Sequence, residues 1–298
     1  MDKTLLHLLY VLYAPFLAIT NMVIRTLISA VSLTAITLNL VLWCVPLSLM
    51  VVLQLLIPPF RPLGHRLMAH IYRMAVWINS FWIQRILGVR IILDGDPPPG
   101  PETQHLVVVS NHRSWFDILV IQHIITGLGG PMLKFLVKRQ LIYVPVVGWI
   151  CLALDFPRLN RSKDQAGRKQ DFQSIQNASE QMLALPGALM NFAEGTRFSL
   201  EKRQARGSDY DYLLNPKPGG LRIILASIGP VAVIDVTLVY PNDHINFWQI
   251  LGGSLERIDV HLHNTSSADI ADESEWLTNR WRMKDELIRA KRLKDTHL

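Results

Sequence analysis

The chain has 298 residues, of which 50% are hydrophobic, and its mean hydropathy of +0.22 is high for a soluble protein. Its 30 basic and 24 acidic residues give a net charge of +6, which suits either anionic lipid or nucleic acid as a partner. The sequence has no zinc-ligand spacing, Walker loop or dinucleotide fingerprint, which argues against the corresponding metal and nucleotide sites. The two cysteines, Cys44 and Cys151, are expected to be reduced thiols.

Residues 1–60 predict a membrane anchor. There is no charged residue from 26 to 60, and residues 4–24 are nearly as apolar. A transmembrane helix needs about 20 apolar residues, so one helix fits, and two would fit on either side of Arg25. The stretch is too long for a cleaved signal peptide. With an anchor present, a lipid surface explains the positive charge more simply than nucleic acid does.

Residues 61–88 predict a helix that lies along the membrane interface. Arginines at 61, 66, 73 and 85 are mixed with Met, Ile, Trp and Phe, a composition typical of a helix whose cations face lipid headgroups. Positive residues directly after an apolar segment also indicate that this side of the membrane is the cytoplasmic one.

Residues 89–265 alternate between strand and helix patterns, which predicts an α/β domain with a sheet covered by helices. Strands are expected at residues 89–94, 106–109, 150–156, 188–191 and 231–239, and helices at 115–125, 134–142, 164–185 and 217–227. The period of two in residues 255–263 predicts an edge strand with one solvated face. Residues 201–212 are charged and polar, which predicts an exposed loop. Residues 266–298 hold an amphipathic helix at 274–294, which is expected to pack on the domain rather than on the bilayer.

A candidate base follows the strand at 106–109. His112 stands at the end of this strand, and Asp117 lies five residues later, at the start of the next helix. Imidazole is the usual base toward an alcohol, and a carboxylate can fix its tautomer and stabilise its positive charge. Five residues on a continuous helix are about 140° apart, so the pair can meet only if His112 belongs to the loop. Ser114 is expected to cap the helix. This spacing alone also arises by chance.

A candidate anion site follows the strand at 188–191. Gly195 lets the backbone approach a ligand closely, Thr196 offers a hydroxyl, and Arg197 can grip a phosphate through two hydrogen bonds. Glu194 is expected to anchor this loop. The alternative interpretation is a glycine turn that carries a surface salt bridge.

Together these segments resemble the signatures NHxxxxD and FPEGTR of the glycerolipid acyltransferase family. Residues 111–117 read Asn-His-Arg-Ser-Trp-Phe-Asp, and residues 192–197 read Phe-Ala-Glu-Gly-Thr-Arg. The similarity covers roughly residues 65–260. Residues 213–220 and 235–241 resemble the branch that includes lysocardiolipin acyltransferases and bacterial inner-membrane acyltransferases. The resemblance implies a central mixed sheet covered by helices.

The resemblance also implies roles for single residues. His112 is then the catalytic base, Asp117 is its partner, and the loop from Glu194 to Arg197 shapes the site for the acceptor's phosphate. Three residues support the motifs: Asn111, Ser114 and Lys138.

The family's second motif is poorly matched. An arginine after this motif contacts phosphate in the family, and both Arg158 and Arg161 are candidates for its place. The distance from Phe156 and Pro157 favours Arg161. The alternative interpretation of the basic run Arg158, Arg161 and Lys163 is a solvated loop. Ala193 replaces the usual proline of the third motif, a small change that we expect to be tolerated.

By this resemblance the protein is a membrane-anchored O-acyltransferase. It is expected to move a fatty acyl group from acyl-CoA or acyl carrier protein to a lysophospholipid hydroxyl. The first-choice acceptor is 1-acyl-sn-glycerol-3-phosphate, whose acylation gives phosphatidic acid. Lysophosphatidylglycerol and lysocardiolipin are alternative acceptors. No metal, redox cofactor or nucleic acid is expected to take part. The expected location is a bacterial inner membrane, with the catalytic domain on the cytoplasmic side.

Two rival interpretations remain. One is a membrane-tethered lipid-binding protein without turnover, against which the intact His112–Asp117 pair counts. The other is a lipid A acyltransferase, whose pattern is HxxxxxE; here Ile118 stands where the carboxylate would be, which disfavours it.

Overall fold

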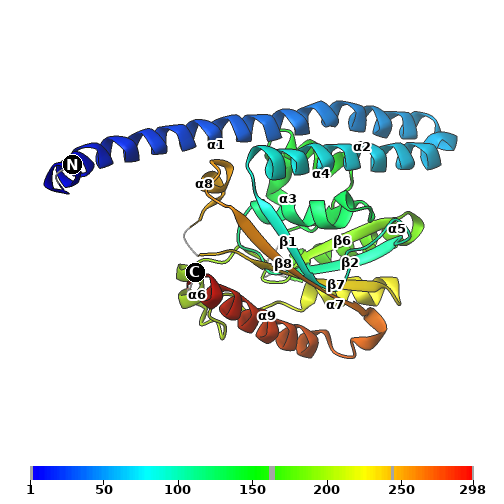
Figure 1. The fold of residues 1–298 in the computed structure, drawn as a ribbon. Helices are drawn as coiled ribbons and strands as arrows, with labels where there is room; N and C mark the ends of the chain where they lie inside the picture. The colour runs from blue at the N-terminus through cyan, green and yellow to red at the C-terminus, as the bar shows by residue number, and fades with distance from the viewer. Residues whose placement is uncertain (1–2, 161–164, 243–244, 297–298) are drawn as a thin grey trace.

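In the computed structural model, which describes residues 3–160, 165–242 and 245–296, a helical hairpin lies on an α/β domain (Figure 1). The hairpin consists of α1 (Lys3–Leu56) and α2 (Arg61–Phe81), joined by the short helix η1 (Pro58–Phe60). α1 tolerates single prolines at Pro15 and Pro46, but Pro58 and Pro59 are adjacent, and two consecutive residues without a backbone N–H favour the end of the helix. The π-helical segment η2 (Trp82–Ile86) extends α2.

α1 is one continuous helix, not the two that the sequence also allowed. Its residues 18–56 are long and apolar enough to cross a membrane, by length and composition. From Arg25 onward the helix is fixed to the domain: the Arg25 guanidinium donates to the Gly253 carbonyl at 3.2 Å, and the Ser29 hydroxyl donates to the Trp248 carbonyl at 2.8 Å. The part before Arg25 projects beyond the domain (Figure 1).

Six strands form one mixed sheet in the order β1-β8-β7-β2-β6-β3. All neighbouring strands are parallel except β7 and β8, which are antiparallel, so the predicted mixed sheet is confirmed. The strands are β1 (Arg90–Gly95), β2 (His105–Ser110), β3 (Leu133–Phe135), β6 (Gly187–Phe192), β7 (Ala232–Val239) and β8 (Arg257–Ser266).

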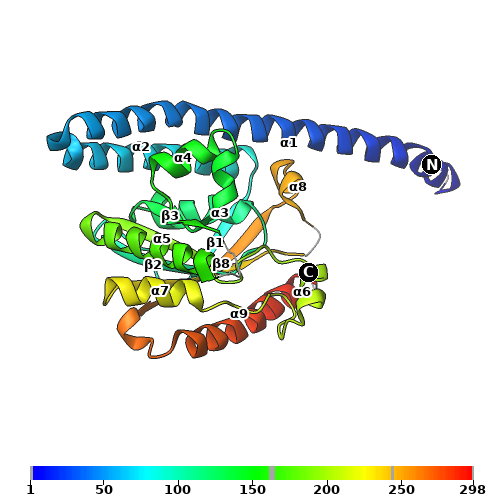
Figure 2. The ribbon, with the colours of Figure 1, turned by 180° about the vertical axis from the view of Figure 1, so that it is seen from behind.

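Helices cover both faces of this sheet, and β2 contributes to the core on each side. Leu106 and Val108 point into the core under the hairpin, whereas Val107 and Val109 point into the opposite core. Side chains alternate along a strand, so a strand covered on both faces reads as a continuous apolar run. The first face carries α3 (Phe116–Gln122), η3 (His123–Gly127) and α4 (Val147–Ala153) with the hairpin; the second carries α5 (Gln165–Ala184), α7 (Gly219–Ile228) and α9 (Glu273–Thr296) (Figures 1 and 2).

The C-terminal helix α9 packs on the domain, as expected. Trp281 is fully buried at the interface between α9 and the sheet. A buried ion cluster adds to this contact: Asp235 of β7 lies 2.6 Å from the Lys284 ammonium and 2.7 Å from the Arg280 guanidinium. Lys284 also donates to the Val236 carbonyl at 2.6 Å. The cluster therefore joins α9 to a central strand of the sheet.

Residues 134–156 differ from the prediction. The helix expected at 134–142 is wrong: this stretch forms the end of β3, then β4 (Val137–Lys138) and the 3-10 helix η4 (Arg139–Tyr143). The strand expected at 150–156 is also wrong, because α4 occupies most of it; β5 (Arg158–Leu159) follows and pairs with β4. A short apolar run cannot be assigned to strand or helix by periodicity alone.

Two further expectations are corrected. Residues 255–263 do not form an edge strand, because β8 pairs with β7 on one side and with β1 on the other. The predicted loop at 201–212 begins as a helix, α6 (Leu200–Arg206), whose N-terminus is capped by the Ser199 hydroxyl and whose end is turned by Gly207 at φ +56°. The remaining short helices are α8 (Phe247–Leu251) and η5 (Ser267–Asp269). Cys44 and Cys151 are free thiols.

Candidate active site

The candidate residues gather where three neighbouring strands end. β2, β6 and β7 run parallel, so their carboxyl ends lie at the same edge of the sheet. The loop with His112 follows β2, the loop with Glu194 follows β6, and Tyr240 follows β7. Crevices at the carboxyl ends of strands are the usual ligand sites of open α/β sheets.

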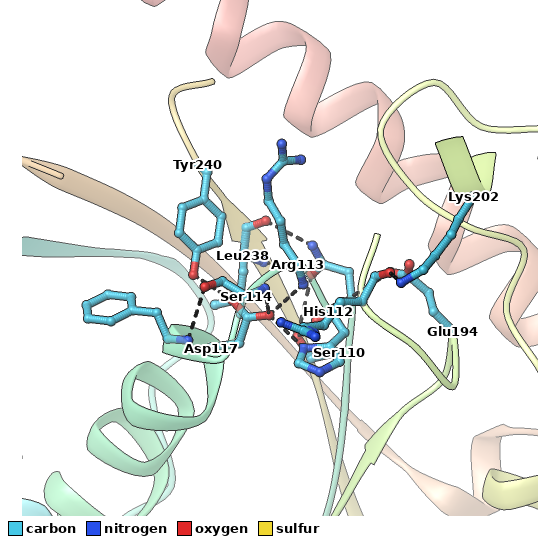
Figure 3. Close-up of polar contacts among 12 residues, drawn as sticks. Ser110, His112, Arg113, Ser114, Asp117, Glu194, Lys202, Leu238 and Tyr240 are labelled. Carbon is cyan, nitrogen blue, oxygen red and sulfur yellow. Dashed lines mark hydrogen bonds and ion pairs between the residues drawn. The ribbon is translucent and has the colours of Figure 1, made fainter. Parts of the chain in front are cut away.

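His112 and Asp117 form a hydrogen-bonded pair (Figure 3). The distance from His112 Nδ1 to Asp117 Oδ2 is 2.8 Å, and the His112 side chain is 12% exposed whereas Asp117 is fully buried. His112 lies in the loop before α3 and Asp117 in the first turn of the helix, which is the arrangement that the spacing required. Because the carboxylate accepts the Nδ1 proton, Nε2 is the ring nitrogen that can take a proton from a substrate.

Asp117 is held by three donors besides His112. The backbone N–H groups of Arg113 and Ser114 donate to Oδ2 at 2.6 and 2.9 Å, and the Tyr240 hydroxyl donates to Oδ1 at 2.5 Å. Burial, followed by the nearby charge of Asp117, raises the pKa of Tyr240 well above its ordinary value, so this side chain is a neutral donor. The carboxylate is therefore fixed from both of its oxygens.

Tyr240 is a site residue that the sequence analysis did not identify. Its contact with Asp117 joins positions 123 residues apart in the chain. The only available signal was its place in residues 235–241, which resemble one branch of the family but carry no reactive pattern.

Asn111 and Ser114 support the loop that carries His112. The Asn111 amide donates to the Leu238 carbonyl at 3.0 Å and its oxygen accepts the Leu238 N–H at 2.9 Å, so the loop is attached to β7. α3 begins one residue later than expected, with Trp115 in the capping position. The Ser114 hydroxyl nevertheless accepts the N–H of Phe116 at 3.2 Å and satisfies one free donor of the first turn.

Glu194 joins two loops beneath the site. One carboxyl oxygen accepts the His112 N–H at 3.1 Å, and the other accepts the Leu214 N–H at 3.2 Å. The side chain is fully buried, and this burial raises its pKa to about 8. These contacts suit an anchor. The His112 ring itself stacks on Phe192, with 3.8 Å between the ring centroids.

The loop after Glu194 presents cations beside the His112 loop. Gly195 has φ +67°, a conformation that favours glycine. Arg197 is exposed, and its guanidinium lies 4.8 Å from the centre of the Trp115 ring. Lys202 of α6 adds a second cation, because its ammonium donates to the Thr196 hydroxyl at 3.3 Å and to the Arg197 carbonyl at 2.9 Å. The sequence analysis missed Lys202, since it placed this residue in a loop.

A second basic region lies on the strand pair β4–β5. Lys138 is opposite Leu159, and Arg158 is the preceding residue of β5; both basic side chains are exposed. Lys138 also lines a groove of about 230 Å³ together with Arg139, Gln140, Tyr143, Leu159 and Asn160. This lining does not include His112. Arg161, the favoured candidate for the second motif, lies outside the described residues, as does Lys163.

The chain is similar to known acyltransferases. The Acyltransferase family model matches residues 97–240. The chain is 26% identical over 247 residues to the 1-acyl-sn-glycerol-3-phosphate acyltransferase delta of Rattus norvegicus, with coverage of 76% of this chain and 63% of that protein. It is 24% identical over 236 residues to the lysophosphatidylinositol acyltransferase 10 of Caenorhabditis elegans, covering 70% of this chain and 60% of the relative. The chain thus spans less than two thirds of the length of these relatives.

One solved structure has a similar fold. The 1-acyl-sn-glycerophosphate acyltransferase PlsC of Thermotoga maritima superposes with a TM-score of 0.52 at 16% identity, covering 86% of this chain and 98% of that one. At this identity the similarity concerns the fold. The family match, the relatives named above and the two motifs that end β2 and β6 support the assignment of the chain to the glycerolipid acyltransferase family.

Proposed function

We propose that this protein transfers a fatty acyl group from a thioester donor to the free hydroxyl of a lysophospholipid. The observation that carries the proposal is the pair formed by His112 and the buried Asp117, 2.8 Å apart at the carboxyl end of β2. A protein that only binds lipid has no need of an oriented base at this point. The cationic loop that begins at Glu194 lies next to it, which supports an acceptor with a phosphate group.

The proposed mechanism uses general-base catalysis. His112 Nε2 takes the proton from the acceptor hydroxyl while the oxygen attacks the thioester carbonyl carbon. Asp117 stabilises the imidazolium that forms, as the carboxylate does in a serine protease, with the substrate hydroxyl in place of the serine. The carbon–sulfur bond then breaks, and the thiolate leaves and takes the proton from His112. The products are an ester and a free thiol. Because no atom changes oxidation state, the reaction as proposed needs no redox group.

The acceptor's phosphate is assigned to the cations of the loop after β6. Arg197 and Lys202 extend from this loop and from α6, and a guanidinium can bind phosphate through two hydrogen bonds. A further contact is assigned to Arg158 or Arg161. The first-choice acceptor is 1-acyl-sn-glycerol-3-phosphate, in keeping with the name of the rat relative; lysophosphatidylglycerol, lysocardiolipin and lysophosphatidylinositol are the alternatives.

The proposed location is the membrane, with the α/β domain on the cytoplasmic side, where acyl-CoA and acyl carrier protein are found. The apolar helix α1 supports the membrane location. The arginines of α2 support the orientation, since positive residues next to an apolar segment favour the cytoplasm. The bacterial inner membrane is the specific membrane proposed.

The test is an acyl-transfer assay on the full chain in detergent, with acyl-CoA and the four lysophospholipids offered separately. We expect ester formation with at least one acceptor and a loss of roughly 10²–10⁴-fold in His112→Ala. His123→Ala is the matched control, since His123 lies in η3 and bonds to Ser80 rather than to Asp117. Turnover that survives in His112→Ala would contradict the proposed mechanism, and binding of lysolipid without turnover in the wild type would favour a lipid-binding protein.

A further inference from the structure

Large apolar side chains are exposed between β4 and β5. Tyr143, Val144, Trp149 and Leu152, here called the 143–152 patch, are 77%, 43%, 64% and 50% exposed. The other side of the same segment is packed, since Cys151 is only 3% exposed. A contiguous apolar surface on an otherwise folded element marks a contact with a partner or a membrane.

The backbone fixes the shape of this segment. The Gly148 N–H donates to the Val144 carbonyl at 2.8 Å. A Cβ at position 148 would lie 2.0 Å from the Ile142 carbonyl oxygen, so the turn closes more tightly than any side chain allows. Val146 has φ +66°, a strained conformation that persists only where the surroundings enforce it. The patch is therefore held in place rather than left to fold back on the domain.

The charge around the 143–152 patch is mainly positive. Residues 133–155 contain three basic residues, Lys134, Lys138 and Arg139, and one acidic residue, Asp155. Lys138, Arg139 and Tyr143 line the same groove of about 230 Å³. Aromatic residues next to cations are typical of the zone where a protein meets anionic headgroups, because the rings enter the lipid while the cations stay at its surface.

The helix α4, which carries the end of the 143–152 patch, lies beside the hairpin. α4 packs against α1, and both views place α4 beside the hairpin, at the end of the molecule opposite α9 (Figures 1 and 2). On α1, Leu42, Val45 and Leu49 are 62%, 69% and 53% exposed. The apolar helix proposed as the anchor and the helix that carries Trp149 and Leu152 are thus neighbours in the structure.

From these observations we propose that the 143–152 patch inserts into the surface of an anionic bilayer. It holds the groove of Lys138 and Arg139 at headgroup level, so that a lysophospholipid enters the active site directly from the lipid phase. The membrane contact stands on the exposed side chains and their charge, whereas the identity of the entering lipid rests on the proposed function.

The test uses the full chain with Trp149→Gln and Leu152→Gln combined. Phe172→Gln with Met283→Gln is the control, because these side chains are 47% and 55% exposed on α5 and α9. Activity is measured with two acceptors: oleoyl lysophosphatidic acid in phosphatidylethanolamine–phosphatidylglycerol vesicles, and hexanoyl lysophosphatidic acid dissolved as monomers. Burial of the Trp149 and Leu152 side chains in the lipid contributes binding free energy, so their replacement should lower kcat/KM with the vesicles about tenfold or more. We expect no loss with the soluble acceptor, and none in the control with either acceptor.

An equal loss with both acceptors would overturn the proposal, because the patch would then act on folding or on the active site. So would an unchanged kcat/KM with vesicles. A second measurement does not depend on turnover. Brominated lipids in the vesicles should quench part of the tryptophan fluorescence of the wild type, and this part of the quenching should be missing in Trp149→Phe. Absence of this quenching overturns the membrane contact. Loss of a dimer in detergent when the patch is changed would count further against it. Quenching without any acyl transfer would leave the contact standing and refute the proposed function instead.

Discussion

Tyr240→Phe tests whether the tyrosine holds the catalytic carboxylate. The change removes one hydroxyl that donates to Asp117 Oδ1 at 2.5 Å inside the protein. A hydrogen bond to a charged group contributes about 1.5–3 kcal/mol, so the free energy of unfolding should fall by about this amount. For a chain of this size the Tm should fall by roughly 3–10 °C. The decrease in kcat should be no more than about tenfold, because His112 bonds to the other carboxylate oxygen, Oδ2.

The measurement is thermal or urea unfolding of the full chain in detergent, with acyl transfer followed in parallel. Tyr212→Phe is the matched control: it removes the same atom near the site, and the Tyr212 hydroxyl has no hydrogen-bond partner among the described residues. The assigned role of Tyr240 is refuted if Tyr240→Phe unfolds at the same midpoint as the wild type. It is also refuted if Tyr212→Phe lowers the free energy of unfolding as much as Tyr240→Phe does.

Three further predictions concern the substrate loop, the buried acid and the anchor. Arg197→Ala should raise KM for the lysophospholipid far more than for the acyl donor, because it removes a charge-assisted contact to the acceptor; an equal rise for both would make the loop structural. Glu194 has a folded-state pKa of about 8 against an ordinary value of 4.5, so the folded protein holds this proton more tightly than the unfolded chain. Its contribution to stability should therefore decrease as the pH rises from 4.5 to 8, by up to about 5 kcal/mol. Unfolding curves of Glu194→Gln should lack this part of the pH dependence, and parallel curves would contradict it. Deletion of residues 1–58 should release much of the protein from membranes and leave a remainder that high salt removes, since that attraction is largely electrostatic; release of the intact protein by salt alone would argue against a spanning helix.

The sequence predicted those parts of the fold in which a local pattern carries the information. The buried strand at 106–109 appeared as an apolar run because both faces of β2 are covered. The partner of an alternating strand is a long-range choice, however, and nothing within residues 255–263 signals that β1 pairs beside it. Residues 134–156 were misassigned because elements of two to seven residues are too short to express a period.

The candidate site divides in the same way. His112 and Asp117 lie in one loop and one helix turn, so their spacing was enough to expect the contact that the structure contains. Tyr240 reaches the site through the folding of a distant segment, and no spacing rule connects it to Asp117. Lys202 lies close in sequence to its partners Thr196 and Arg197, and it was missed because residues 201–212 were predicted to form a loop rather than to begin as α6. The roles of all these residues stay predictions until the variants are assayed.

The ion cluster beneath the sheet determines how much of the chain is needed for folding. Asp235 belongs to the region matched by the family model, but both of its cationic partners, Arg280 and Lys284, come from α9, 40 and 44 residues beyond the end of that region. Leaving a buried charge without its partner costs about 3–5 kcal/mol, a large part of the 5–15 kcal/mol that keeps a typical domain folded. A shortened protein cut after β8 would therefore carry an uncompensated carboxylate in a central strand. We therefore expect a protein trimmed to the family domain to be much less stable than the full chain, because it also loses Trp281, which is fully buried in the full chain.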